Sequence, residues 1–357
     1  MRIDAGQSNK IIAMHEIAIE QARFRRDDNG PPYLQASSPG FRDEWLPQVE
    51  RLLVGFGIRL PGVSCPLAVF AQPLGVMHIA VVQVADRGDP RALFIHVLVC
   101  HRPDYEHFLG DPFALARLFP AKWEDQGPLP TLTMARGPLP PRTLPQVQAV
   151  LQRVKAGALK ENEDPEHPDF QRTPGNSESP ALLGGVQALV EGGKLVFERA
   201  LPDPGLVEGL WTLLPQSNRA RLWPASFAFS NALGFDVLVV PRVHVSDFEG
   251  YISEDQAADY PAGNYELALQ VAAEAGNQRE LDALLNRRSG RDTFKLGWIL
   301  LAACVFLVLA PRILVLFQPS DTFPTSKAAA AAGMVASGDP WTALGLKLHG
   351  DTIWRRP

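Results

Sequence analysis

Four side chains that often ligate metals lie within twelve residues of one another: His96, Cys100, His101 and His107. Imidazole and thiolate groups bind zinc, but no Cys-x-x-Cys or His-x-x-x-His pair completes a tetrahedral set here. The run that contains His96 and Cys100 is typical of a β-strand, whose two-residue period places both on one face with Leu98. We therefore interpret His96 as a core histidine and predict no metal ligand.

Covalent catalysis would need a serine or cysteine held beside a base and an oxyanion hole. The sequence has no Gly-x-Ser-x-Gly elbow, and Ser38 stands in a Ser-Ser-Pro-Gly turn. Cys100 and His101 are neighbours on the predicted strand, so their side chains point to opposite faces. We predict no catalytic residue and keep one enzymatic alternative, a membrane-bound hydrolase of unknown substrate in which His15, His96 and Ser38 converge on one cleft.

Glycine-rich phosphate cradles are also absent from the sequence, which contains neither Gly-x-x-x-x-Gly-Lys-Ser/Thr nor Gly-x-Gly-x-x-Gly. We therefore expect that the protein is not itself a P-loop GTPase or ATPase, and we predict no cofactor. The net charge is −5, which argues against nucleic acid as a partner because phosphate binding needs a basic face. The three cysteines make an odd count, which argues against a disulfide framework.

The elements that would position these residues are predicted to form two α+β domains in a cytosolic portion of the chain. The N-terminal α+β domain covers residues 11–159, and a smaller α+β domain covers residues 181–250. Residues 160–180 between them are acidic and rich in proline, and such a stretch buries too little apolar surface to offset the entropy of ordering it. We predict a linker there.

The N-terminal domain is predicted to contain an antiparallel meander. Apolar runs at residues 66–71, 76–85 and 92–100 are separated by short turns rich in glycine and proline, as antiparallel neighbours require. An earlier strand is predicted at residues 11–22, and apolar residues at helical spacing predict a helix over residues 42–55.

The smaller domain is predicted to alternate helices and strands. Helices are expected at residues 181–190 and 205–213, and strands at 194–198, 226–230 and 235–240.

Residues 264–288 are predicted to form a helical hairpin directly before the most apolar part of the chain. Gly276 and Asn277 interrupt the helical pattern and would form the tight turn of an αα-hairpin. One continuous helix with a kink at Gly276 is the alternative.

Residues 296–310 contain no charged side chain, and after Pro311 and Arg312 the apolar run resumes to residue 317. A helix of roughly 20 apolar residues crosses a bilayer core of about 30 Å. We therefore predict one transmembrane helix over residues 296–317, with a buried helix of a soluble core as the alternative. The membrane anchor would include Leu296, Trp298, Phe306 and Phe317.

Basic residues crowd the N-terminal flank of this span: Arg287, Arg288, Arg291 and Lys295. Under the positive-inside rule this flank lies in the cytoplasm. The first twenty residues lack the apolar core of a cleaved secretory signal, so the span itself would direct insertion. We expect a single-pass membrane protein, with its N-terminal portion in the cytoplasm and a low-complexity tail, residues 318–357, outside.

Three passages of the cytosolic portion carry a family resemblance. The first begins at His15-Glu16 and continues through Leu-Gln-Ala-Ser-Ser-Pro-Gly-Phe at residues 34–41. The second runs from Ala-Leu-Phe-Ile-His-Val-Leu-Val at 92–99 to Asp-Pro-Phe at 111–113, and the third spans residues 213–230. In this order they resemble the N-terminal and middle domains of the bacterial GTPase-associated proteins. The resemblance implies an accessory protein that works beside a small GTPase in a conflict or defence system, and it brings no catalytic residues with it.

The sequence therefore predicts a membrane-anchored, non-enzymatic adaptor whose partners are the lipid bilayer and a protein, expected to be a small GTPase. A further alternative is a sensor in which the tail at residues 318–357 binds a signal and the span relays it.

Overall fold

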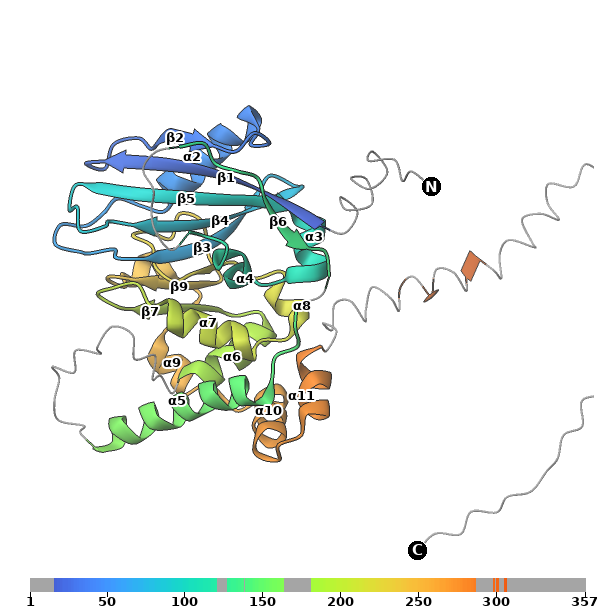
Figure 1. Ribbon diagram of the computed structural model, residues 1–357. Coiled ribbons are helices and arrows are strands. Elements are labelled where there is room, and N and C mark those ends of the chain that lie inside the picture. Colours follow the sequence, from blue (N-terminus) through green and yellow to red (C-terminus); the bar gives the residue numbers. More distant parts are fainter. Residues whose placement is uncertain are drawn as a thin grey trace, which may run out of the picture. The chain divides into compact units, whose positions relative to one another are not determined.

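The computed structural model describes residues 16–120, 127–137, 139–163 and 181–286, together with positions 298, 300, 301, 305 and 306. The chain divides into two compact units, Met1–Leu296 and Gly297–Pro357, and each is described by itself. The first unit is built on one mixed sheet in the order β10-β7-β9-β8-β3-β4-β5-β1-β2, with β6 paired to β1 outside that path. Figure 1 shows these strands stacked from β2 to β7, with α5, α6 and α7 gathered beyond the β7 end of the sheet.

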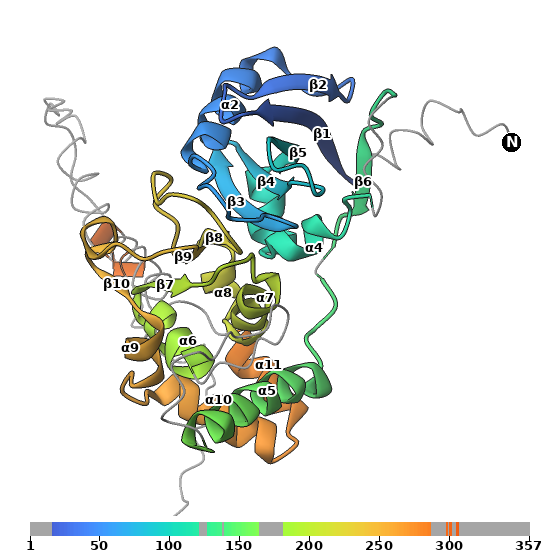
Figure 2. The ribbon, with the colours of Figure 1, turned by 90° about the vertical axis from the view of Figure 1, so that its left-hand side faces the viewer.

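The predicted antiparallel meander is confirmed. Strands β3, β4 and β5 pair in sequence order and antiparallel, and β1 pairs with β5 on the far side. Helices α2 and α4 cover opposite faces of this part of the sheet (Figure 2), so its central strands are buried on both faces and form nearly continuous apolar runs. The strands are β1 Glu16–Asp27, β2 Tyr33–Ser37, β3 Ala68–Leu74, β4 His78–Ala85, β5 Ala92–His101 and β6 Leu132–Ala135.

The strands of the C-terminal half run parallel to one another. They are β7 Lys194–Glu198, β8 Pro224–Ala225, β9 Val237–Val240 and β10 Tyr251–Ile252. The short β8 joins them to the meander, because Ala225 pairs with Phe70 of β3 and the backbone N–H of Val69 donates to Ser226 Oγ at 2.8 Å. The two stretches predicted as separate domains therefore contribute strands to one sheet.

The helices pack against the sheet or against one another. Gly184 of α6 is needed where α9 approaches, because a Cβ there would lie 2.0 Å from the carbonyl oxygen of Ala257. The helices are η1 Asp43–Trp45, α2 Leu46–Gly55, α3 Arg102–Asp104, η2 Tyr105–Leu109, α4 Pro112–Ala116, α5 Leu144–Glu163, α6 Ala181–Glu191, α7 Pro204–Leu213, α8 Gln216–Arg219, η3 Val245–Phe248, α9 Glu254–Ala258, α10 Asn264–Glu274 and α11 Gln278–Leu285.

The helical region before the apolar segment consists of two helices, α10 and α11, as the hairpin interpretation predicts. Gly276 adopts a φ of +67°, which ends α10, and the Asn277 side chain accepts from the N–H of Glu280 to begin α11. The hairpin is fixed to the body of the unit, because the Tyr265 hydroxyl donates to Leu213 O at 2.6 Å and Arg142 donates to Leu285 O at 3.3 Å.

Arg142 satisfies backbone carbonyls at the C-terminal ends of two helices, Thr212 O in the last turn of α7 at 2.9 Å and Leu285 O at the end of α11. We expect Arg142→Leu to lower the free energy of unfolding by about 2–3 kcal/mol, because it leaves these carbonyls without their donor. Urea unfolding followed by circular dichroism would measure the loss. Arg153→Leu, at an exposed position on α5, should stay within about 0.5 kcal/mol of wild type, and equal stability of the two variants would contradict the role of Arg142.

The predicted transmembrane helix falls largely outside the described residues. Five of its positions are described, and all five are both helical and exposed, including Trp298 at 58 % and Phe306 at 71 % relative exposure. Among the helices that the structure describes, none is long and apolar enough to cross a membrane. Several predicted features lie outside the described residues. They are the anchor residues Leu296 and Phe317, the basic flank of Arg287, Arg288, Arg291 and Lys295, most of the predicted linker, and the tail at 318–357. The span and its flank stay predictions.

Candidate protein-binding site

The residues of the hydrolase alternative do not meet in the described structure. His15 lies outside the described residues. The Ser38 hydroxyl donates to Glu20 Oε2 at 2.5 Å, while His96 Nε2 lies 2.8 Å from Gln21 Oε1. Glu20 and Gln21 are consecutive on β1, so their side chains lie on opposite faces of the sheet. Ser38 and His96 therefore contact different faces rather than one cleft.

His96 is a core histidine, as its place on a strand predicted. It is 1 % exposed, and its ring lies 5.1 Å from that of Phe119. Burial, with a smaller contribution from the charge of Arg23, lowers the pKa of His96 to about 4, so the ring is neutral at pH 7. Cys100 is also buried, and burial raises the pKa of its thiol well above the usual range. No group of three or more His, Cys, Asp or Glu side chains in the described part of the chain could hold a metal ion.

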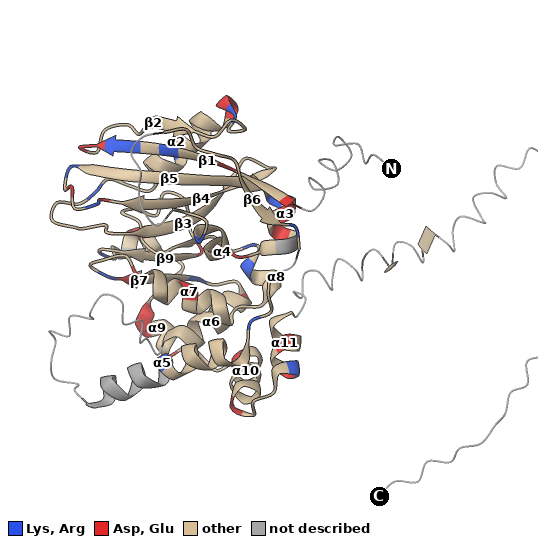
Figure 3. Ribbon diagram, viewed as in Figure 1, with Lys and Arg blue, Asp and Glu red and all other residues tan. Residues whose placement is uncertain are grey.

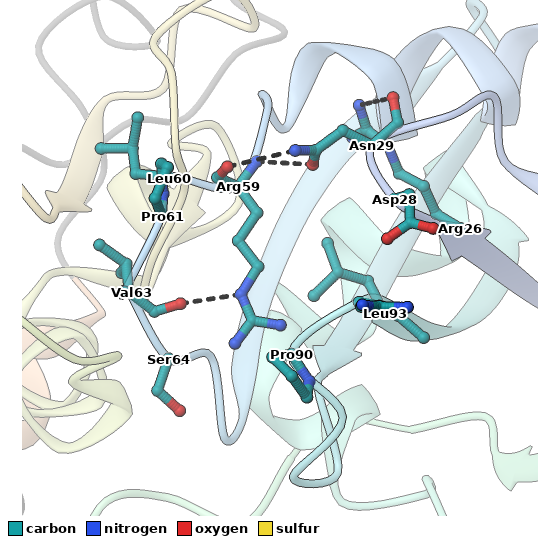
Figure 4. A pocket seen from close by; sticks show the side chains of 13 residues that line it. Arg26, Asp28, Asn29, Arg59, Leu60, Pro61, Val63, Ser64, Pro90 and Leu93 are labelled. Atoms are coloured by element: carbon teal, nitrogen blue, oxygen red, sulfur yellow. Dashed lines mark hydrogen bonds between the residues drawn. The ribbon is translucent and has the colours of Figure 1, made fainter.

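A cleft of about 350 Å³ lies where β1 ends and β5 begins (Figure 4). One wall is the loop of residues 57–64 that follows α2, which we call the 57–64 loop, and the other is formed by the turns that flank β1 and β5. The side chains around it are partly charged and partly apolar. They are Arg26, Asp28, Asn29, Arg59, Leu60, Pro61, Val63, Ser64, Pro90, Arg91, Ala92 and Leu93, with Gly62.

Arg59 and Asp86 hold the 57–64 loop against the turn before β5. The Arg59 guanidinium donates to Asp86 Oδ2 at 2.8 Å, to Val63 O at 2.8 Å and to Asp89 O at 3.1 Å. Asp86 also accepts from the N–H of Cys65 at 2.7 Å. Its pKa is lowered: burial acts to raise it, but the N–H groups of Cys65 and of the following turn, the Ser64 hydroxyl and the Arg59 charge outweigh burial.

Arg26 and Asn29 fix the same loop to the end of β1. Arg26 is 4 % exposed and donates to Gly57 O at 2.8 Å and Gly30 O at 3.0 Å. Its guanidinium lies at the C-terminus of α2, where the helix dipole favours a cation, and burial lowers its pKa. Asn29 pairs with the backbone of Arg59 in both directions, accepting its N–H at 2.9 Å and donating to its carbonyl at 3.3 Å.

Two apolar side chains of the 57–64 loop, Ile58 and Leu60, nevertheless face solvent, whereas Val63 is partly buried. Ile58 is 62 % exposed and Leu60 is 41 % exposed. Charged residues of both signs lie nearby, and Figure 3 shows basic and acidic segments side by side at the end of β1. A fixed loop that presents apolar side chains beside a polar margin has the composition of a protein interface, and its rigidity reduces the entropy lost on binding.

The residues that build this cleft were not singled out from the sequence, although the turn between the apolar runs at 76–85 and 92–100, which forms part of its wall, was predicted. Searches of protein-family models, of curated proteins and of solved structures found no match to the chain. The site is therefore interpreted from its own geometry.

Proposed function

We propose that the chain is a non-enzymatic adaptor that binds a protein partner through the 57–64 loop and the cleft beside it. The observation that carries the proposal is the exposure of Ile58 and Leu60 on a loop whose backbone is fixed by Arg59, Arg26 and Asn29. Exposed apolar side chains that cluster on a surface often mark an interaction site.

The charges around the cleft favour a protein over a small charged ligand. Arg59 is occupied by Asp86, and Arg26 by backbone carbonyls at the end of α2. Exposed Asp28 and Arg91 have opposite signs and lie at the margin. The 57–64 loop and the cleft therefore offer a partner two exposed apolar side chains, Ile58 and Leu60, beside charged and polar ones, a mixture that is typical of protein interfaces.

The sequence provides the expectation for the kind of partner and for the location of the adaptor. The resemblance to bacterial GTPase-associated proteins makes a small GTPase the expected partner. The apolar segment at residues 296–317 would tether the adaptor to the cytoplasmic membrane, with the body of the protein on the cytoplasmic side. In this arrangement the bilayer is the second partner.

Co-purification of the full-length chain in mild detergent tests the proposal. We expect a GTP-binding protein to be recovered with the wild type, and Ile58→Asp combined with Leu60→Asp to reduce that recovery at least tenfold, because a charge at the apolar centre of an interface must be desolvated. The matched control is Val76→Asp, at an 81 % exposed position at the opposite end of β3. Circular dichroism would verify that all variants fold. A bait that recovers no GTP-binding protein, or a loop variant that recovers as much as the control, would overturn the proposal.

A further inference from the structure

A second cleft, of about 440 Å³, opens at the carboxyl end of β9. Pro241 and Arg242 leave β9 along one side of it, and residues 229–232, which follow β8, line it as well. Strands β7, β8 and β9 are parallel, so their carboxyl ends meet at one edge of the sheet (Figure 2). In open sheets with parallel strands, ligands bind outside this edge. The cleft lies outside this edge, next to the end of β9.

Aromatic rings form part of its lining and are fixed in place. Phe229 packs edge-to-face on Phe56 with ring centroids 5.4 Å apart, and its N–H donates to Phe56 O at 2.9 Å. Phe248 packs edge-to-face on Tyr251 at 5.5 Å. Asn231 is held between these segments, since it accepts from the Tyr251 hydroxyl at 3.0 Å. A preformed apolar and aromatic lining suits a planar ring.

Two basic side chains complete the cleft. Arg242 and His244 both line it, both are exposed, and they stand two residues apart. The residue between them is fixed, because the N–H of Val243 donates to Glu198 Oε2 at 2.9 Å. Within the described part of the chain, neither the Arg242 nor the His244 side chain has a hydrogen bond or an ion pair. The backbone carbonyl of His244 accepts from the N–H of Asp247 at 2.9 Å, and the Asp247 carboxylate, also in the lining, accepts from the Ser246 hydroxyl. Both side chains are thus available to an anion.

We propose that this cleft binds a purine nucleoside monophosphate, with the ring against the aromatic lining and the phosphate at Arg242 and His244. The volume lies in the range of about 300–1,000 Å³ found for small-ligand clefts. In this cleft the phosphate would be bound by side-chain donors and not by the backbone N–H groups of a glycine-rich loop. The absence of glycine-rich phosphate motifs from the sequence is therefore compatible with this site. Leu60 of the 57–64 loop also lines the cleft, which brings the ligand next to the proposed partner surface.

Isothermal titration of the full chain in detergent with AMP and with GMP tests the inference. We expect at least one of them to bind, and adenosine or guanosine without phosphate, as well as ribose 5-phosphate without a base, to bind at least tenfold more weakly. Arg242→Gln should weaken nucleotide binding at least tenfold, and His244→Gln should also weaken it. The matched control is Arg279→Gln, an exposed arginine on α11, which should leave binding unchanged.

Several results would overturn the inference: no binding of either nucleotide, binding unaffected by Arg242→Gln in a variant that unfolds at the wild-type temperature, or equal binding of ribose 5-phosphate. The last result would reduce the site to a phosphate contact without recognition of the ring. Because Arg242 lies outside the 57–64 loop, loss of nucleotide binding and loss of the protein partner are separate results.

Discussion

Replacing Asp86 by alanine is expected to lower the free energy of unfolding by about 3–5 kcal/mol, the usual cost of removing one partner of a buried ion pair. The substitution leaves the Arg59 guanidinium, whose side chain is 13 % exposed, without its carboxylate, and the N–H of Cys65 without its acceptor. Urea unfolding gives the loss in stability. Hydrogen exchange should show faster exchange in the 57–64 loop, since Asp86 holds that loop to the turn before β5.

The matched control for Asp86→Ala is Asp28→Asn, which removes an exposed carboxylate in the lining of the same cleft and keeps a side chain that tolerates the φ of +45° at this position. It should change stability by no more than about 0.5 kcal/mol. Removing both members of the pair, Asp86→Ala with Arg59→Met, should recover part of the loss, because no unpaired charge then remains buried. Equal stability of Asp86→Ala and Asp28→Asn would contradict the proposed role of Asp86 in fixing the loop.

Asp86 also makes the free energy of unfolding depend on pH in the acid range. The pKa of Asp86 is lower in the folded chain than the ordinary aspartate value, so the folded state holds this proton less tightly than the unfolded state. Its stabilising contribution is fully present above about pH 4 and declines as the pH falls through the lowered pKa. Between about pH 4 and pH 2 the wild type should therefore lose stability more steeply than Asp86→Asn, as urea midpoints at several pH values would show.

The meander was predictable because its signals are local. Gly75 and Gly88 both adopt positive φ, at +64° and +80°, and they stand in the turns that separate the three apolar runs. The end of the first strand was placed less well: β1 runs from Glu16 to Asp27, past the predicted end at residue 22, while residues 11–15 of the prediction lie outside the described residues. Its C-terminal part is rich in arginine, a composition that indicates a loop in sequence, whereas in the fold Arg26 is buried and satisfied by backbone carbonyls.

The union of both halves in one sheet could not be predicted, because it depends on a strand of two residues. The prediction of a strand at residues 226–230 was wrong, and β8 is Pro224–Ala225. Beyond β8 the backbone N–H groups donate to three different segments: Ser226 to Val69 O, Ala228 to Val239 O and Phe229 to Phe56 O. Such a segment has the alternating apolar residues of a strand but forms no ladder with one neighbour.

The candidate site was missed for a related reason. Arginine and aspartate in a sequence usually indicate surface, and nothing in the spacing of Arg26, Arg59 and Asp86 shows that they are buried together. Their contacts join residues 27 to 31 positions apart, and only the fold brings them together. The residues Asp28-Asn29-Gly30 are a local signal for a turn, because aspartate and asparagine tolerate the left-handed region. In the structure Asp28 and Asn29 adopt φ of +45° and +60° there.

The second large effect concerns the membrane. Full-length protein should sediment with membranes and resist extraction at alkaline pH, because a helix of about 20 apolar residues partitions into the bilayer. Arginine at the centre of such a helix costs about 2.5–3.5 kcal/mol for each substitution. Leu301→Arg combined with Val305→Arg should therefore shift partitioning by about 5–7 kcal/mol and move the protein to the supernatant.

The control for this pair uses the same substitutions at the same spacing elsewhere in the chain. Leu267 and Val271 are exposed on α10, at 49 % and 58 %, so Leu267→Arg combined with Val271→Arg adds the same charge outside the apolar segment. This variant should sediment as the wild type does. If wild-type protein stays in the supernatant without detergent and without aggregating, or if both double variants behave alike, residues 296–317 are not the anchor, and an adaptor function would have to operate without a membrane tether.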